Sequence, residues 1–308
     1  MEQQSQQDWV SPRQAARAIG VSESSLKRWC DQGIIHSVRT AGGHRKMARG
    51  EVLKFVRSRK QTLASPELLG LPPSSDHSSL GLERGKTRFT EALISGEEAL
   101  ARQIVFDLYM AQYSFCQIFD LVIAAAFKEI GDLWDCNDIE VYQERRACEI
   151  CSRILFEIRK FQGSPDRKLL AIGGTIEGDQ YALPQMMVEL VLRDVGFDAI
   201  SLGTSIPFDS LIRAIEENKP ALFWLSVSHI DENIDFVNDF QPLSETCSRL
   251  GTALVVGGSA LTDKLRQNMS YSAYCDTMQH LEGFAKTITG AMGKTSAKGQ
   301  SSKSDPDQ

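Results

Sequence analysis

The second half of the chain alternates between two kinds of segment, and this alternation constrains the fold more than any other feature. Apolar runs of strand length are separated by amphipathic runs of helix length. Strands that are apolar throughout are buried on both faces, which is typical of a parallel sheet covered by helices. We therefore predict a doubly wound α/β domain of the Rossmann or flavodoxin type over residues 164–292. The predicted strands are Leu169 to Ile172, Ala199 to Leu202, Leu222 to Val227 and Ala253 to Val256, with a weaker fifth unit from Tyr274 to Ala291.

The segment before this domain has the period of helices throughout. Four helical patterns are joined by short connections, and helices joined in this way pack as antiparallel neighbours. We predict a four-helix bundle over residues 86–163. The helices expected are 87–95, 97–109, 114–136 and 139–161.

The first sixty residues combine a helix-turn-helix with a hairpin. Ser11 and Ser22 are good helix caps, and Gly20 separates the two helices that they begin. A glycine turn at 40–43 joins two short strands, which predicts a wing. The sequence therefore predicts a winged helix-turn-helix of the α+β class over residues 1–62. The strands expected are 34–39 and 44–47, and a third helix is expected at 51–60.

Two further segments show neither the helical nor the strand period of apolar residues. Residues 63–85 gather proline, serine and glycine, which predicts a flexible linker, and residues 293–308 predict a disordered tail. No apolar run approaches the ~20 residues that a bilayer span requires, and the amino terminus has no signal-peptide core. We expect a cytoplasmic protein with no membrane partner.

Charge divides the chain into two unlike parts. Residues 1–60 hold 12 basic and 5 acidic groups, a net charge of +7, whereas the remaining 22 basic and 35 acidic groups give −13. A basic head on an acidic body points to a head that binds a polyanion such as duplex DNA. The candidate DNA-binding residues are Ser24, Ser25, Lys27 and Arg28 on the second helix, and Arg39, His44, Arg45 and Lys46 on the wing.

Seven cysteines, an odd number, lie scattered through apolar sequence, which fits a reduced compartment better than a disulfide framework. Cys148 and Cys151 form a CxxC inside a helical pattern. We interpret them as buried structural thiols, with metal or redox work as the alternative. The five histidines show no metal spacing, and nothing resembles a nucleophile elbow, a phosphate loop or paired catalytic acids. No enzyme and no metal site are predicted.

The head resembles the DNA-binding domain of MerR-family regulators. The resemblance covers nearly all of residues 9–60 and is most specific at Arg39-Thr40-Ala41-Gly42-Gly43-His44-Arg45; Val10 to Ala16, Gly20 to Ser22 and Leu26 to Trp29 also match. It implies a transcription regulator that binds a double-stranded operator and associates with itself as a dimer or tetramer.

The bundle resembles the helical cap of cobalamin-binding domains, in the order found in MerR-type photoreceptors of the CarH kind. In that family a Trp and a Glu-His pair cover the upper face of the corrin. Trp134 and Glu144 match this pattern, and Arg145 stands at the His position.

The α/β domain continues the resemblance. Asp179 matches an acidic position, Tyr181 stands where the family has a cobalt-ligating His, and Pro184 replaces a Gly. The implied cofactor is cobalamin, which is adenosylcobalamin in the resembling photoreceptors. The candidate cofactor-binding residues are Trp134, Glu144, Asp179 and Tyr181, with Gly203, Ser226, Ser228, Gly257 and Gly258 from segments that match those around the nucleotide tail of the vitamin.

The replacement of the ligating His leaves two interpretations open. A phenol, with an ordinary pKa of ~10, must lose its proton before it ligates well, whereas neutral imidazole is a ready donor. Either the vitamin binds without a protein ligand to cobalt, or the pocket is empty or serves another ligand or protein. In both cases we predict a DNA-binding transcription regulator whose C-terminal half is a cobalamin-sensor-like ligand or oligomerisation module. The alternative is a corrinoid carrier or a cobalamin-binding enzyme module.

Overall fold

The structure is a computed structural model that describes residues 9–72, 81–162, 169–232 and 235–300, with side chains described as far as residue 290. The chain divides into two compact units, Met1–Gly163 and Ser164–Gln308. Residues 73–80 of the predicted linker and 301–308 of the predicted tail lie outside the described residues.

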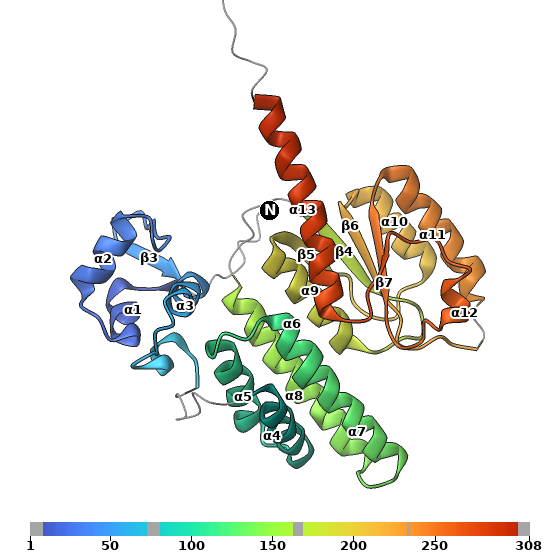
Figure 1. The fold of residues 1–308 in the computed structure, drawn as a ribbon, viewed down its shortest axis with the longest axis horizontal. Helices are drawn as coiled ribbons and strands as arrows, with labels where there is room; N and C mark the ends of the chain where they lie inside the picture. The colour runs from blue at the N-terminus through green and yellow to red at the C-terminus, as the bar shows by residue number, and fades with distance from the viewer. Residues whose placement is uncertain (1–8, 73–80, 163–168, 233–234, 301–308) are drawn as a thin grey trace, which may run out of the picture. The chain divides into compact units, whose positions relative to one another are not determined.

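The first unit begins with the helix-turn-helix and its wing (Figure 1). Ser11 and Ser22 cap the first two helices as predicted, because their hydroxyls accept hydrogen bonds from the amides of Gln14 and Ser25. Gly20 ends the first helix in the left-handed conformation, with φ +83°. The elements are β1 (Trp9–Val10), α1 (Pro12–Ile19), α2 (Glu23–Asp31), β2 (Val38–Arg39), β3 (Arg45–Ala48) and α3 (Arg49–Ser58).

The wing has one strand more than the sequence predicts. The three strands form an antiparallel sheet in the order β1-β3-β2, with Val10 opposite Met47 and Arg39 opposite Arg45. A two-residue strand such as β1 has no period of its own and is defined only by its partner. The head encloses a small core of fully buried side chains, namely Leu26, Ile35, Met47, Val52, Leu53 and Val56.

The start of the predicted linker is ordered, which corrects that prediction for residues 63–72. A short 3-10 helix, η1 (Pro66–Leu69), follows the head, and Leu63, Leu69 and Leu71 are buried. Three leucines that find buried sites fix a segment whose prolines and serines suggested flexibility. The bundle also begins earlier than predicted, at Leu82.

Beyond its earlier start, the bundle differs from the predicted helices mainly in the third one. The predicted helix 114–136 is divided by a π-helical stretch, η2, which shifts the face that the segment presents to its neighbours. Its side chains Phe119, Val122 and Ile123 are buried. The elements are α4 (Leu82–Ser95), α5 (Glu98–Met110), α6 (Phe115–Ile118), η2 (Phe119–Ala124), α7 (Ala125–Asp135) and α8 (Val141–Phe161).

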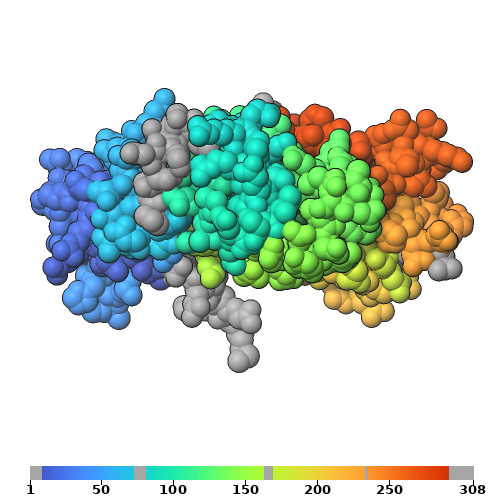
Figure 2. All heavy atoms as spheres, turned by 90° about the horizontal axis from the view of Figure 1, so that it is seen from below, coloured from blue at the N-terminus to red at the C-terminus, as the bar shows by residue number. Residues whose placement is uncertain are grey.

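Arginines join the head to the bundle, and the two adjoin in the space-filling view (Figure 2). The Arg57 guanidinium of α3 lies 3.7 Å from the centroid of the Tyr109 ring and donates to the carbonyl of Tyr113 at 3.0 Å. Arg49, also on α3, lies 5.4 Å from the centroid of the Phe161 ring at the end of α8. The head is therefore fastened to the ends of α5 and α8.

The second unit is the predicted doubly wound domain. Its five strands are parallel and run in the order β5-β4-β6-β7-β8, the flavodoxin-like order. The helix α13 continues to Gln300, so the predicted tail is helical over 293–300. The elements are β4 (Leu169–Thr175), α9 (Ala182–Val195), β5 (Phe197–Ser201), α10 (Phe208–Asn218), β6 (Leu222–Ser226), α11 (Phe236–Leu250), β7 (Ala253–Gly257), α12 (Asp263–Arg266), β8 (Ala273–Tyr274) and α13 (Met278–Gln300).

The two faces of this sheet differ in chemistry. One face, under α10 and α11, holds an apolar cluster that includes Ile172, Phe223 and Val256. The other face is covered by α9 and α13, which pack against each other (Figure 1). Over the described ranges of the chain, no helix has both the length and the apolarity needed to cross a membrane.

Candidate functional site

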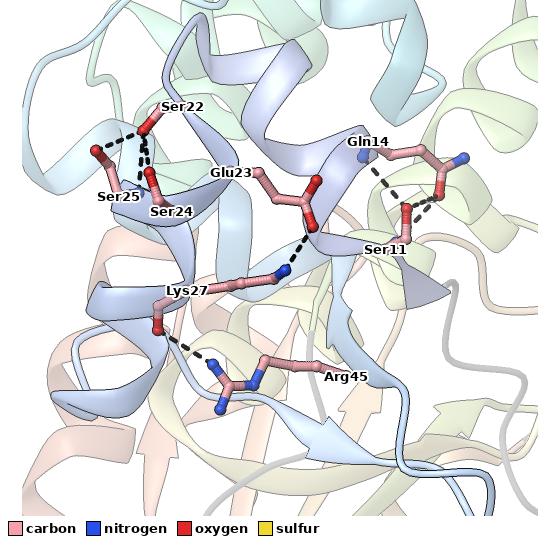
Figure 3. Close-up of polar contacts among 8 residues, drawn as sticks. All are labelled: Ser11, Gln14, Ser22, Glu23, Ser24, Ser25, Lys27 and Arg45. Atoms are coloured by element: carbon pink, nitrogen blue, oxygen red, sulfur yellow. Dashed lines mark hydrogen bonds and ion pairs between the residues drawn. The ribbon is translucent and has the colours of Figure 1, made fainter.

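The amino end of α2 presents small polar side chains to solvent. The Ser22 hydroxyl lies 2.9 Å from the hydroxyls of both Ser24 and Ser25 (Figure 3). Ser24 is exposed and Ser25 is half-buried. Hydroxyls at a helix amino end can donate to phosphate oxygens or to base edges in the major groove. The structure therefore places both predicted serines where a duplex could reach them.

The basic residues of α2 are exposed as well. Lys27 pairs with Glu23 one turn earlier, at 2.8 Å, and about half of each side chain is exposed (Figure 3). Pairs of this kind contribute little to stability, so Lys27 can exchange its partner for a phosphate at small cost. Arg28, the next residue, is also exposed.

Arg45 lies on the wing as predicted, and its side chain is held by α2. Its guanidinium donates to the carbonyl of Lys27 at 3.1 Å (Figure 3) and to the carboxylate of Asp31 at 2.6 Å. The hydrogen bond to Asp31 raises the pKa of Arg45, and only 16% of the Arg45 side chain is exposed. Arg45 thus fastens the wing to the carboxyl end of α2. Arg39, His44 and Lys46 are the exposed wing residues.

The cap candidates flank the loop between α7 and α8. Trp134, on the last turn of α7, is 48% exposed. Glu144 lies in the first turn of α8, half-buried, and Arg145 lies 3.4 Å from it with 73% of its side chain exposed. Val141 and Tyr142, which the sequence reasoning missed, are 51% and 64% exposed. The sequence contains a signal for them, because Val141 and Tyr142 are largely apolar and begin a helix beside polar residues. These exposed apolar side chains suit a flat apolar ligand or a protein surface.

Asp179 is committed to the backbone of its own domain. The residue is fully buried. One carboxylate oxygen accepts from the amide of Tyr181 at 3.0 Å, and the other accepts from the amides of Ser228 and His229 at 2.6 and 3.3 Å. The carboxylate therefore ties the loop after β4 to the loop after β6, and it has no role as a free ligand.

Two further hydroxyls, both missed by sequence reasoning, tie the same loop to the segment that follows β5. The Thr175 hydroxyl donates to the Asp179 carbonyl at 2.6 Å and accepts from the Ser205 amide at 2.9 Å. The Ser205 hydroxyl accepts from the Gly178 amide at 3.1 Å. The two contacts with Ser205 join residues that lie 27 and 30 positions apart, and contacts at such separations leave no local pattern in the sequence.

Tyr181 stands at the entrance of α9 with 55% of the residue exposed. A neutral phenol is a weaker donor to cobalt than a neutral imidazole. Pro184 lies in the first turn of α9, where a missing amide hydrogen costs nothing. The proline that replaces the Gly of the resembling family is thus accommodated in the helix.

The remaining candidates lie at or just beyond the carboxyl ends of the strands. Ser226 is buried and Ser228 is half-buried. Gly203 and Gly258 adopt positive φ angles of +108° and +118°. A Cβ atom on Gly257 would overlap the carbonyl of Cys275, and one on Gly258 would overlap the backbone of Val227. Neighbouring backbone segments therefore lie too close to Gly257 and Gly258 for any side chain, and this packing explains both glycines without a ligand.

The fit of these residues to a corrinoid is uneven. The exposed apolar side chains of the cap fit the face of a corrin ring. In the α/β domain, Tyr181 stands where the resemblance implies a cobalt ligand. No group of three or more metal-ligating side chains occurs within the part of the chain that the structure describes. The expected cobalt ligand does not fit, and we derive no step through the metal. The hollow that the structure shows at the strand ends, about 550 Å³, lies beside Ser228, His229 and Phe236.

The cysteines are free thiols, in line with the sequence. Burial raises the pKa of Cys148 to about 12, with the neighbouring Glu144 carboxylate adding to the shift. Burial also raises the pKa of Cys151 well above its ordinary value. The CxxC is thus a pair of unreactive thiols inside α8, which supports the structural interpretation over the redox alternative.

Two family models match the chain. Residues 9–60 match a helix-turn-helix domain, and residues 86–158 match a B12 binding domain. The first match covers the head and the second covers α4 to most of α8.

Curated relatives and solved structures extend the likeness to the second unit. The trimethylamine corrinoid protein of Methanosarcina barkeri is 20% identical over 60% of this chain and 87% of its own length. The dimethylamine corrinoid protein 1 of Methanosarcina acetivorans is 19% identical over 56% and 82%. The structure of the Methanosarcina barkeri monomethylamine corrinoid protein superposes with a TM-score of 0.58 at 16% identity, and covers 68% of this chain and all of that one. The helical and α/β parts therefore share the fold of corrinoid proteins, and the chain joins a helix-turn-helix domain to a B12-binding domain.

Proposed function

We propose that this chain is a MerR-type transcription regulator in which the helical cap and the α/β domain act as a corrinoid-sensor-like module that controls self-association. One observation carries the proposal. A helix-turn-helix domain with exposed Ser24, Lys27 and Arg28 on α2 and an exposed basic wing is joined in one chain to a B12-binding domain. A carrier that only exchanges groups with an enzyme has no use for such a head.

In this proposal α2 enters the major groove of a double-stranded operator. Ser24, Ser25 and Arg28 meet base edges or phosphates, while Arg39 and Lys46 of the wing neutralise phosphates nearby. The protein binds as a dimer or tetramer and catalyses no reaction. The corrinoid is held without a protein ligand to cobalt, because Tyr181 stands at that position.

The experiment has a DNA arm and a corrinoid arm. Duplexes selected from a random pool by the full chain are tested for preference over unselected DNA in a salt series. Separately, the protein is incubated with adenosylcobalamin in the dark, passed over a desalting column and scanned in the visible range. Light scattering then gives the oligomer size before and after illumination. Preference for the selected duplex together with a co-eluting corrin supports the proposal; absence of any duplex preference contradicts it.

The second candidate is a corrinoid carrier, since the curated relatives are named as corrinoid proteins. Their coverage of the helical and α/β parts favours it. A carrier binds cobalamin firmly and shows no sequence preference for DNA, so the same two arms separate the candidates. Exposed Tyr181 disfavours a carrier that relies on a cobalt ligand from the protein.

A further inference from the structure

A buried tryptophan stands on the sheet face that carries the candidate corrinoid residues. Trp224 lies in the middle of β6 and is 1% exposed. Side chains alternate along a strand, so Trp224 shares its face with Ser226. Phe223 and Leu225 point the other way and belong to the apolar cluster under α10 and α11. The indole therefore lies on the side of the sheet that α9 and α13 cover.

The indole rests on bare backbone of the neighbouring strand. The register pairs Gly173 of β4 with Ser201 of β5 on one side and with Trp224 of β6 on the other. A Cβ atom on Gly173 would overlap the Cγ and Cδ2 atoms of the indole. Gly173 thus leaves a slot on the sheet surface, and the side chain of Trp224 fills it.

Two candidate residues for the nucleotide tail, Ser226 and Gly257, lie on the rim of this slot. Thr175, Ser226 and Gly257 are paired across the sheet two residues beyond Gly173 and Trp224, on the same face. The Ser201 hydroxyl donates to the side-chain oxygen of Gln185 at 2.9 Å and accepts from the Gly203 amide at 3.2 Å. The chain's own groups therefore occupy both the slot and its rim.

Indole and benzimidazole are fused five- and six-membered rings of nearly the same size. A slot that holds one cannot hold the other at the same time, because protein interiors are close-packed. The indole Nε1 hydrogen has no acceptor among the described residues, although buried donors are nearly always paired. Shape, and not hydrogen bonding, thus holds the ring in the slot.

We infer that Trp224 is a built-in occupant of the slot that the benzimidazole base of a cobalamin would enter. This inference rests on the proposed function and narrows its ligand class. Corrinoids that lack the base, or that keep it outside the protein, fit this domain, and a cobalamin with an inserted base does not.

The first test compares a corrinoid without the base with one that has it. The full chain is titrated with dicyanocobinamide and with cyanocobalamin. We expect cobinamide to bind the wild type at least as tightly as cobalamin. Trp224→Ala should shift the preference toward cobalamin by about tenfold or more, because the slot opens. Phe223→Ala, which empties a similar space on the opposite face, should leave the preference unchanged. A wild type that prefers cobalamin tenfold overturns the inference.

The second test needs no corrinoid. Free 5,6-dimethylbenzimidazole should raise the melting temperature of Trp224→Ala by several degrees and should leave the wild type and Phe223→Ala unchanged, as an apolar cavity binds a ligand of matching shape. A folded Trp224→Ala that takes up no base overturns the inference. If that variant does not fold, Trp224→Leu opens part of the slot and the same shifts, smaller in size, are expected.

The two tests fail separately from the proposed function. A wild type that binds neither corrinoid removes the corrinoid part of the proposed function, while the free base still decides whether Trp224 fills a slot of that shape. Base uptake by Trp224→Ala then supports the inference, and its absence contradicts it.

Discussion

At the scale of the residue, the structure shows a structural contact for two side chains that the sequence singles out as binding residues. Arg45 fastens the wing to α2, and Asp179 holds two loops together. Both are committed by partners far away in sequence: Asp31 is 14 residues from Arg45, and Ser228 is 49 from Asp179. Motifs show which residue types are present, but partners at such separations are fixed only by the fold.

Arg45 should act on DNA binding by positioning the wing. We expect Arg45→Ala and Asp31→Asn to weaken binding of the selected duplex by a similar, modest factor, about three- to tenfold, since both break the same contact. Lys46→Ala should instead lower the slope of log K against log salt by about 1, as for the loss of a phosphate contact. Binding is measured by fluorescence anisotropy between low and high salt. A strong loss in Arg45→Ala with none in Asp31→Asn would show that Arg45 contacts DNA directly.

Asp179 should be required for the stability of the α/β unit. In Asp179→Ala, three amides that donate to the carboxylate lose their acceptor, which we expect to cost roughly 2–4 kcal/mol. Hydrogen exchange of β4 and β6 gives the local free energy of opening. Glu177→Ala, an exposed acid in the same loop, is the matched control and should have little effect. Equal protection in both variants would refute the structural role of Asp179.

Thiol reactivity should follow exposure and pKa. Because the pKa of Cys148 is raised to about 12, its thiolate fraction at pH 8 is on the order of 10⁻⁴, and it grows tenfold with each unit of rising pH. In native protein at pH 8 we expect iodoacetamide to label exposed Cys136 well before Cys148. Peptide mass spectrometry over a time course measures both sites, and urea should make Cys148 reactive. Fast native labelling of Cys148 would contradict the structural interpretation of the CxxC.

At the scale of the element, local signals predict helices and tertiary partners decide the rest. Ser11, Gly20 and Ser22 act within their own turns, so the ends of the first two helices are correct from the sequence. The strand β1, by contrast, exists only because β3 pairs with it. Likewise the π-helical stretch η2 lies inside a pattern that looks like one long helix, since π and α hydrogen bonding differ by one residue in spacing and use the same residue types.

The contact of α3 with the bundle gives a prediction at this scale. Arg57→Ala removes a ring contact and a hydrogen bond, which together should weaken docking of the head by about 2 kcal/mol. We expect faster hydrogen exchange in α3 and at the end of α5. Lys54→Ala removes an exposed side chain from the same helix and should change neither. Unchanged exchange in Arg57→Ala would show that the head is held by other contacts.

At the scale of the whole molecule, the charge division finds a structural counterpart. The +7 segment is the helix-turn-helix head, and the −13 remainder holds the bundle and the α/β domain. The parallel sheet is predicted by apolar runs that alternate with helices. The parallel direction of the strands brings Ser226 and Gly257 together at the carboxyl ends of β6 and β7. Sequence reasoning missed that the indole of Trp224 covers Gly173 on the same sheet face. This contact depends on the register between β4 and β6, and a register between strands about 50 residues apart leaves no pattern in the sequence.

The single helix α8 runs from the exposed cap residues to the head. Its amino end carries Tyr142 and Glu144, and its carboxyl end carries Phe161 beneath Arg49 of α3. Its 21 residues make a rod about 30 Å long. A rigid helix of this length that tilts by about 5° around its middle moves each end by about 1 Å. Helix shifts of about 1–2 Å accompany conformational switching in other proteins. Through α8, a displacement of Tyr142 and Glu144 at its amino end would reach the contact between Phe161 and Arg49 of the head.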